Sequence, residues 1–183
     1  MKKQAFLIGE KVYLRAFQPG DEEMIARIEN HPDPRLTLFY AFPTTTEYQF
    51  EKTQKQLADK NNIVFTICCI ENDQPIGQTA LLRIDWVGRM AVFYIGIADK
   101  ENWSKGYGSE TLAVVLEYAF NTVNINRVQL VVAVENTAAV KVYQKSGFLI
   151  EGTLREAMYH QGRYCDFYIM GILKSDWDKK NNL

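Results

Sequence analysis

The segment Trp103–Glu110 constrains this chain most, because it joins an apolar strand to an amphipathic helix through a glycine loop. Residues 92–98 before it form a short apolar run rich in β-branched and aromatic side chains, which is typical of a buried strand. Gly106 and Gly108 allow unusual φ values and a close approach of the backbone to a ligand. The positive end of the helix dipole points at the same loop, so we expect it to bind phosphate. One helix face behind the loop is apolar: Leu112, Val115, Leu116, Ala119 and Phe120.

Two common phosphate motifs do not fit this loop. A dinucleotide fingerprint needs a third glycine where Thr111 stands, and no segment carries the Gly-x-x-x-x-Gly-Lys-Ser/Thr pattern of a P-loop. Taken alone, the Gly-x-Gly spacing is equally compatible with a plain turn at the start of a helix.

A second segment predicts a short capped helix after the apolar strand 128–134. Asn136 is a good N-cap and Gly147 a good helix stop, with ten residues between them. Tyr143 follows Asn136 by seven residues, about two turns, so both lie near one line along the helix. Each residue alone is also compatible with a purely structural role, the tyrosine packing on the sheet.

Together the two segments resemble motifs of the GCN5-related N-acetyltransferase (GNAT) family. The family's Gln/Arg-x-x-Gly-x-Gly/Ala loop corresponds to residues 103–108, and its Asn-x-x-Ala-x-x-x-Tyr-x-Lys-x-Gly-Phe helix to residues 136–148. Residues 151–173 look like the final hairpin of the RimJ/RimL-like ribosomal-protein and spermidine acetyltransferase branches. The resemblance covers essentially the whole chain, so we expect one N-acetyltransferase domain over residues 1–183.

The resemblance implies an α/β (α+β) fold. Its central sheet would be mixed, mostly antiparallel and seven-stranded, splayed between the fourth and fifth strands and flanked by helices. The sequence pattern itself predicts helices from Asp21 and from Thr45 or Thr46 to about Asp59, with a loop around Pro32 and Pro34 between them. It predicts strands over 12–16, 63–70, 76–86, 91–98 and 128–134, and a hairpin that turns at 160–162.

The resemblance also implies acetyl-coenzyme A (acetyl-CoA) as co-substrate and a direct transfer of acetyl to an amine. Tyr143 would be the general acid that protonates the leaving thiolate, since a phenol pKa near 10 suits a thiol near 8.5. The cofactor-binding residues that it implies are Ile95, Gly96, Ile97, Trp103, Ser104, Lys105, Gly106, Tyr107, Gly108, Ser109, Asn136 and Tyr143.

The chain departs from the family pattern at three positions. Trp103 and Ser104 stand where Gln or Arg and Gly are usual, and Val92 stands where related sequences often carry a glutamate base. At pH 7 an α-amine is about one part in seven neutral, but an alkylamine only about one part in 2,500, so an α-amine needs a base less. We therefore expect a peptide or protein N-terminal α-amine as acceptor. A polyamine or other small amine is the alternative, and a non-catalytic acyl-CoA sensor is an alternative of another class.

The early helical region forms the acceptor side in this family. Possible bases or amine anchors there are Glu29, His31, Asp33 and Tyr40, each of which also suits a surface or capping role. Tyr40 and Trp86 are the candidate substrate residues, although ordinary packing explains their aromatic rings equally well.

Composition excludes several other classes of function. A net charge of −1 gives no footprint for nucleic acid, and no run is long enough for a membrane span. The apolar stretch within residues 1–9 is too short for a signal peptide, so we expect a cytoplasmic protein. Three cysteines and two histidines lack the spacing of a metal site, so we expect none. Family members often dimerise, which makes a homodimer possible, but no segment identifies an interface.

Overall fold

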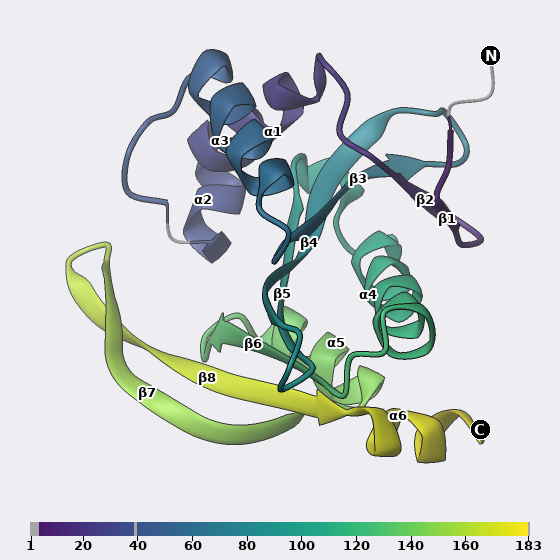
Figure 1. Cartoon of the computed structure of the whole chain (residues 1–183). Coiled ribbons are helices and arrows are strands. Elements are labelled where there is room, and N and C mark those ends of the chain that lie inside the picture. Colours follow the sequence, from purple (N-terminus) through teal and green to yellow (C-terminus); the bar gives the residue numbers. More distant parts are fainter. Residues whose placement is uncertain (1–3, 39, 183) are drawn as a thin grey trace.

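The protein, described by a computed structural model over residues 4–38 and 40–182, is built on one mixed sheet (Figure 1). The described strands follow the order β1-β2-β3-β4-β5-β6-β8-β7, and every neighbouring pair except β5 and β6 is antiparallel. The strands are β1 (Leu7–Ile8), β2 (Val12–Arg15), β3 (Ile63–Cys69), β4 (Pro75–Asp85), β5 (Met90–Ile97), β6 (Arg127–Ala133), β7 (Leu149–His160) and β8 (Arg163–Leu173).

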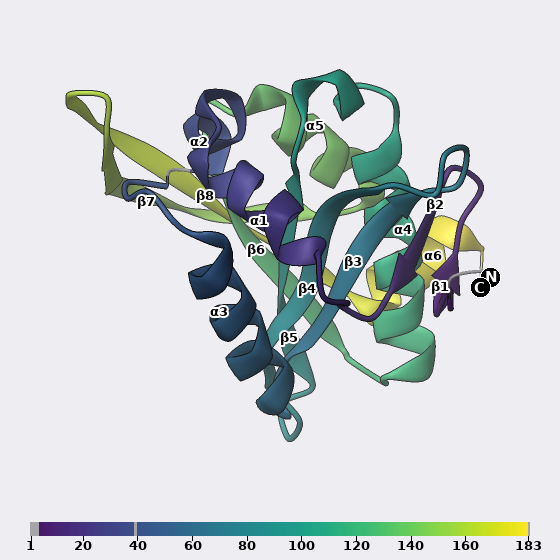
Figure 2. The same ribbon diagram turned by 90° about the horizontal axis from the view of Figure 1, so that it is seen from above.

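Helices cover both faces of the first half of the sheet (Figures 1 and 2). Helices α1 to α3 pack on one face, and α4 packs on the other with α5 beside it. The helices are α1 (Asp21–Asn30), α2 (Pro32–Leu38), α3 (Thr46–Ala58), α4 (Tyr107–Glu117), α5 (Thr137–Ser146) and α6 (Lys174–Asn181). No helix in the described part of the chain is long and apolar enough to cross a membrane.

The sheet splays where its one parallel pair ends. Strand β5 pairs with β6 only through Met90, Ala91 and Val92, whereas its ladder with β4 continues to Ile97. Figure 1 shows β6 to β8 turning away from the first half of the sheet beyond this point. We call the stretch 93–97, which pairs with β4 but forms no ladder register with β6, the splay.

Helix caps and turn residues in the sequence predicted the bounds of several of these elements correctly. Thr45 caps α3 through its side-chain oxygen, which accepts a hydrogen bond from the Tyr48 backbone N–H at 3.1 Å. Gly147 ends α5 at a φ of 104°, a conformation that glycine adopts without steric cost. The expected hairpin turn at 160–162 is confirmed by β7 and β8.

The structure corrects the expected fold in two places. The sheet has eight described strands rather than seven, because the two-residue β1 pairs with β2 across Leu7 and Leu14. Such a short strand has no alternating pattern that a sequence could reveal. The expected loop around Pro32 and Pro34 is helix α2, since a proline in the first turn loses no hydrogen bond that the helix needs.

Candidate functional site

The glycine loop lies at the amino end of α4, as expected. Ser104 and Gly106 both take left-handed φ values, 59° and 90°, which bend the chain into the helix. Gly108 lies within the first helical turn instead, and a Cβ there would have only Ile95 Cδ1 nearby, at 4.0 Å. No described side chain caps α4, so the backbone N–H groups of its first turn have no side-chain acceptor. The arrangement suits an anion.

Two side chains hold this loop against the sheet. The Trp103 indole Nε1 donates to the Ile97 carbonyl oxygen at 3.2 Å, which ties the loop to the end of β5. On the other side, Lys11 Nζ donates to the Lys105 carbonyl oxygen at 3.2 Å. Thus Trp103, an unusual residue at this position, performs a local positioning task with its indole nitrogen.

The other predicted loop residues point in different directions. Tyr107 is buried, and its hydroxyl lies 3.4 Å from the Cys69 Sγ in the core. Ser109 and Gly106 line a groove of about 720 Å³ between α4 and the β1–β2 turn, which also contains Lys11 and Glu110. The carboxylate of Glu110 accepts hydrogen bonds from the backbone N–H groups of Glu10 and Lys11, which fixes that side of the groove.

Within the described residues, part of the backbone of the splay has no strand partner on its β6 side. The Ala98 N–H donates to Ile76 of β4, whereas the Arg89 carbonyl accepts from Arg127 of β6. Because alternate residues of a strand direct their backbone groups to opposite neighbours, the odd-numbered Ile95 and Ile97 face away from β4. Gly96, predicted together with them, directs its own backbone groups toward β4 opposite Gln78.

Tyr143 and Asn136 lie on α5, on the α4 side of the sheet. The Tyr143 ring packs edge-on against Phe93 of β5, with centroids 6.4 Å apart, and against Phe148 at 5.8 Å. Burial raises the pKa of Tyr143 to about 12, and no described group hydrogen-bonds its hydroxyl. Asn136 caps the helix, its Oδ1 accepting from the Ala139 N–H at 3.2 Å.

The opposite face of β5 brings together residues of α1, α2 and the segment after them. The hydroxyls of Tyr40 and Tyr94 lie 3.0 Å apart. Burial raises the pKa of Tyr40 to about 12 and that of Tyr94 well above its ordinary value. The carboxylate of Glu29, a predicted base, is engaged by Lys52 Nζ at 2.6 Å and Gln49 Nε2 at 2.7 Å. Sequence reasoning missed Tyr94, although strand alternation places it on the same face as Val92.

The remaining predicted candidates lie elsewhere. Trp86 is half-exposed in the β4–β5 turn, at the end of β5 opposite the glycine loop, and its indole donates to Asn61 Oδ1 at 3.1 Å. His31 is exposed, and Asp33 pairs with Lys100 at 3.6 Å on the surface. The structure therefore brings Tyr40 to Tyr94 near the splay, whereas Trp86 lies at the other end of β5.

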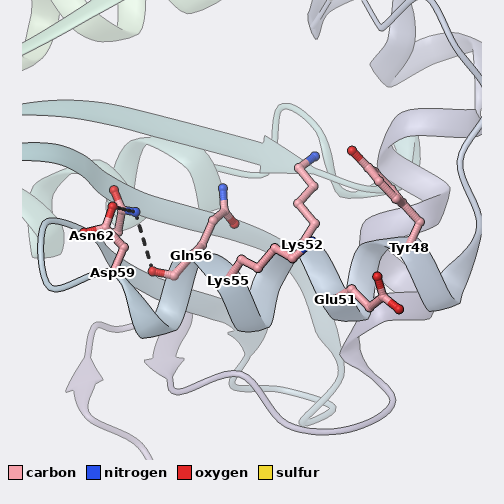
Figure 3. A pocket seen from close by; sticks show the side chains of 7 residues that line it. All are labelled: Tyr48, Glu51, Lys52, Lys55, Gln56, Asp59 and Asn62. Atoms are coloured by element: carbon pink, nitrogen blue, oxygen red, sulfur yellow. Dashed lines mark hydrogen bonds between the residues drawn. The ribbon is translucent and has the colours of Figure 1, made fainter.

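A separate groove of about 330 Å³ runs along α3 (Figure 3). Its lining side chains are polar or charged and come mostly from one face of that helix: Tyr48, Glu51, Lys52, Lys55, Gln56, Asp59 and Asn62. None of them belongs to the glycine loop, the splay or α5. Among the described residues, no group of three or more His, Cys, Asp or Glu side chains is arranged to hold a metal ion.

The chain is similar to known acetyltransferases along most of its length. The family model described as an acetyltransferase (GNAT) domain matches residues 11–149. The spermidine N(1)-acetyltransferase of Vibrio cholerae serotype O1 is 32% identical, over 93% of this chain and 97% of its own. The putative ribosomal N-acetyltransferase YdaF of Bacillus subtilis is 29% identical, over 93% of this chain and 96% of its own.

A solved structure of a spermidine N-acetyltransferase is also similar to this chain along most of its length. The spermidine N-acetyltransferase from Vibrio cholerae, in complex with CoA and spermine, matches with a TM-score of 0.84 at 30% identity. The match covers 91% of this chain and 98% of that one.

Proposed function

Since the chain belongs to the GNAT family of acetyltransferases, we propose that it transfers the acetyl group of acetyl-CoA to a primary amine of a polyamine such as spermidine. The observation that carries this proposal is the full-length similarity to a spermidine N(1)-acetyltransferase, which favours the polyamine alternative over a peptide α-amine. YdaF, at 29% identity, keeps the peptide acceptor as the second candidate.

The loop and the splay fit acetyl-CoA. The uncapped N–H groups at the start of α4 would hold the pyrophosphate, and the loop residues 103–109 would surround it. The pantetheine arm would pair with Ile95 and Ile97 as an added strand, next to Gly96. Because the Ile97 carbonyl already accepts from Trp103, Ile95 supplies the free backbone groups. Asn136 would contact the coenzyme from the cap of α5.

The chemistry needs no protein nucleophile. The amine nitrogen attacks the thioester carbonyl carbon, the C–N bond forms, the C–S bond breaks, and the nitrogen loses its extra proton to solvent. The leaving thiolate accepts a hydrogen bond from the Tyr143 hydroxyl beside it and takes up a proton from solvent. A phenol pKa of about 12 lies roughly 3.5 units above that of a thiol, or about 5 kcal/mol. Tyr143 therefore acts through a hydrogen bond to the developing thiolate more than through complete proton transfer.

Release of free CoA thiol from acetyl-CoA tests this function. The acceptors are spermidine, L-amino acids and peptides that begin with Ser, Ala or Met, each measured between pH 6.5 and 9. We expect release with spermidine at least tenfold faster than with any peptide. Faster release with a peptide would move the acceptor to protein N-termini, and CoA binding without release from any acceptor would support the sensor alternative.

A further inference from the structure

Two tyrosine hydroxyls meet on the face of β5 that the proposed chemistry leaves unused. Phe93 points toward Tyr143, so the alternate residues Val92, Tyr94 and Gly96 face α1 and α2. A Cβ on Gly96 would lie 2.9 Å from the Tyr94 hydroxyl oxygen, so this hydroxyl occupies the space above the glycine. Tyr40 meets it there at 3.0 Å, and we call these two groups the hydroxyl pair.

A buried amide lies beside the hydroxyl pair. Gln78 of β4 is directly opposite Gly96, and opposite residues share a face with Cβ positions about 5 Å apart. Gln78 is only 6% exposed, and its Nε2 has no hydrogen-bond partner in the described part of the chain. An unsatisfied buried amide is costly, so a ligand that hydrogen-bonds it, in either orientation of the amide, is favoured.

The hydroxyl pair lies beside the opening between β5 and β6. Tyr94 and Gly96 belong to the splay, where β5 is not paired with β6, so an acceptor on this face can reach a thioester bound in the opening. Val92 offers no ionisable group on this side, and both carboxylate oxygens of Glu29 are already bonded. Among the described residues named on this face, the groups that remain for a ligand are therefore neutral: two hydroxyls and an amide.

We propose, on the basis of the proposed function, that the hydroxyl pair and Gln78 form the subsite that orients the acceptor nitrogen. One hydroxyl donates to the other, which leaves lone pairs on both oxygens to accept the N–H groups of a neutral primary amine. A neutral primary amine has only two N–H groups, so the oxygen of the Gln78 amide, turned by 180°, is an alternative acceptor for one of them. The nitrogen lone pair then stays free to attack through the splay. Tyr94 and Tyr40 are positioning residues in this scheme.

Removal of single hydroxyls tests the subsite. In Tyr94→Phe and Tyr40→Phe we expect the KM for spermidine to rise at least tenfold, while the KM for acetyl-CoA stays within twofold. Because the hydroxyls act as a unit, the double variant should lose little more than either single one. Tyr118→Phe is the control, since Tyr118 packs against Phe6 and Phe65 away from β5. An unchanged KM for spermidine in Tyr94→Phe would overturn the proposal.

A binding measurement separates this inference from the proposed function. Spermidine is titrated calorimetrically into CoA-saturated wild type, Tyr94→Phe and Gln78→Met, with the thermal unfolding midpoint of each recorded as a check of folding. We expect at least tenfold weaker binding in Tyr94→Phe and weaker binding in Gln78→Met. Wild-type binding that neither variant alters overturns the subsite alone. If wild type releases no thiol, the proposed function is overturned, but a tenfold loss of binding in Tyr94→Phe still supports the subsite. If spermidine does not bind to wild type at all, the subsite is overturned.

Discussion

Among single residues, the hydroxyl of Tyr143 is the one whose removal we expect to affect turnover most directly. Tyr143→Phe keeps the ring contacts with Phe93 and Phe148 and removes only the hydroxyl. We expect turnover of acetyl-CoA with spermidine to fall at least tenfold, because the developing thiolate loses its hydrogen-bond donor. The dissociation constant of CoA should stay within a few fold. Unchanged turnover would remove Tyr143 from the mechanism.

The raised pKa of Tyr143 sets the expected pH dependence. A phenol with a pKa of about 12 stays protonated up to pH 9, so its titration does not limit the rate there. The fraction of neutral alkylamine rises about tenfold per pH unit in this range. We therefore expect kcat/KM for spermidine to rise with a slope near one between pH 7 and 9, in wild type and Tyr143→Phe alike. A plateau near pH 8 in wild type alone would contradict this assignment.

Helix α5 shows at the scale of an element how one residue can serve two roles. Asn136 caps the helix and is also a predicted coenzyme ligand. Asn136→Ala should cost about 1 kcal/mol of unfolding free energy, whereas Asn136→Asp should retain the cap because a carboxylate also accepts the Ala139 N–H. The measurement is urea unfolding together with CoA affinity.

The two substitutions at Asn136 separate these roles. If the side chain contacts the coenzyme, Asn136→Asp should be as stable as wild type yet bind CoA at least fivefold more weakly. Wild-type CoA affinity in Asn136→Asp would leave Asn136 with the capping role alone.

Helix α2 and the loop before α4 show what local patterns can and cannot predict. The caps of α3 and α5 were predictable because a cap involves residues only three positions apart. Helix α2 was missed because two prolines signal a loop, although both fall in the first turn where they are tolerated. The left-handed φ of Ser104 follows from the family pattern, in which glycine is usual at that position.

A buried ion pair that fixes α1 to the sheet contributes to the stability of the whole fold. Arg15 and Asp21 are each 3% exposed, and both guanidinium NH groups reach the carboxylate. Burial of Asp21 opposes ionisation, but hydrogen bonds from Arg15, the Gln18 backbone and Thr66 outweigh it and lower its pKa. This stability is therefore present above the unfolded pKa near 3.9 and is lost as the pH falls through the lower folded pKa.

Asp21→Asn tests this ion pair. We expect a loss of about 3–5 kcal/mol at pH 7, because an unpaired guanidinium would stay buried. Urea unfolding measures the loss, and Asp176→Asn is the control, since the exposed pair of Asp176 with Lys179 should contribute under 1 kcal/mol. Equal small losses in both variants would contradict the structural role of Asp21.

Local sequence patterns were enough to predict the parts of this protein whose physical basis is local. These are the glycine loop before α4, the capped helix that presents Asn136 and Tyr143, and the alternating strands. Each depends on residues within a few positions of one another, so periodicity, caps and the family motifs predicted it.

The residues that meet on the acceptor side could be identified from the three-dimensional fold alone. Tyr40 and Tyr94 are 54 residues apart, and their meeting depends on how α1 and α2 pack over Gly96. The free backbone of Ile95 likewise exists because β6 pairs with β5 only through Val92. Neither feature leaves a local signal, since each depends on how segments far apart in the sequence are placed in the fold.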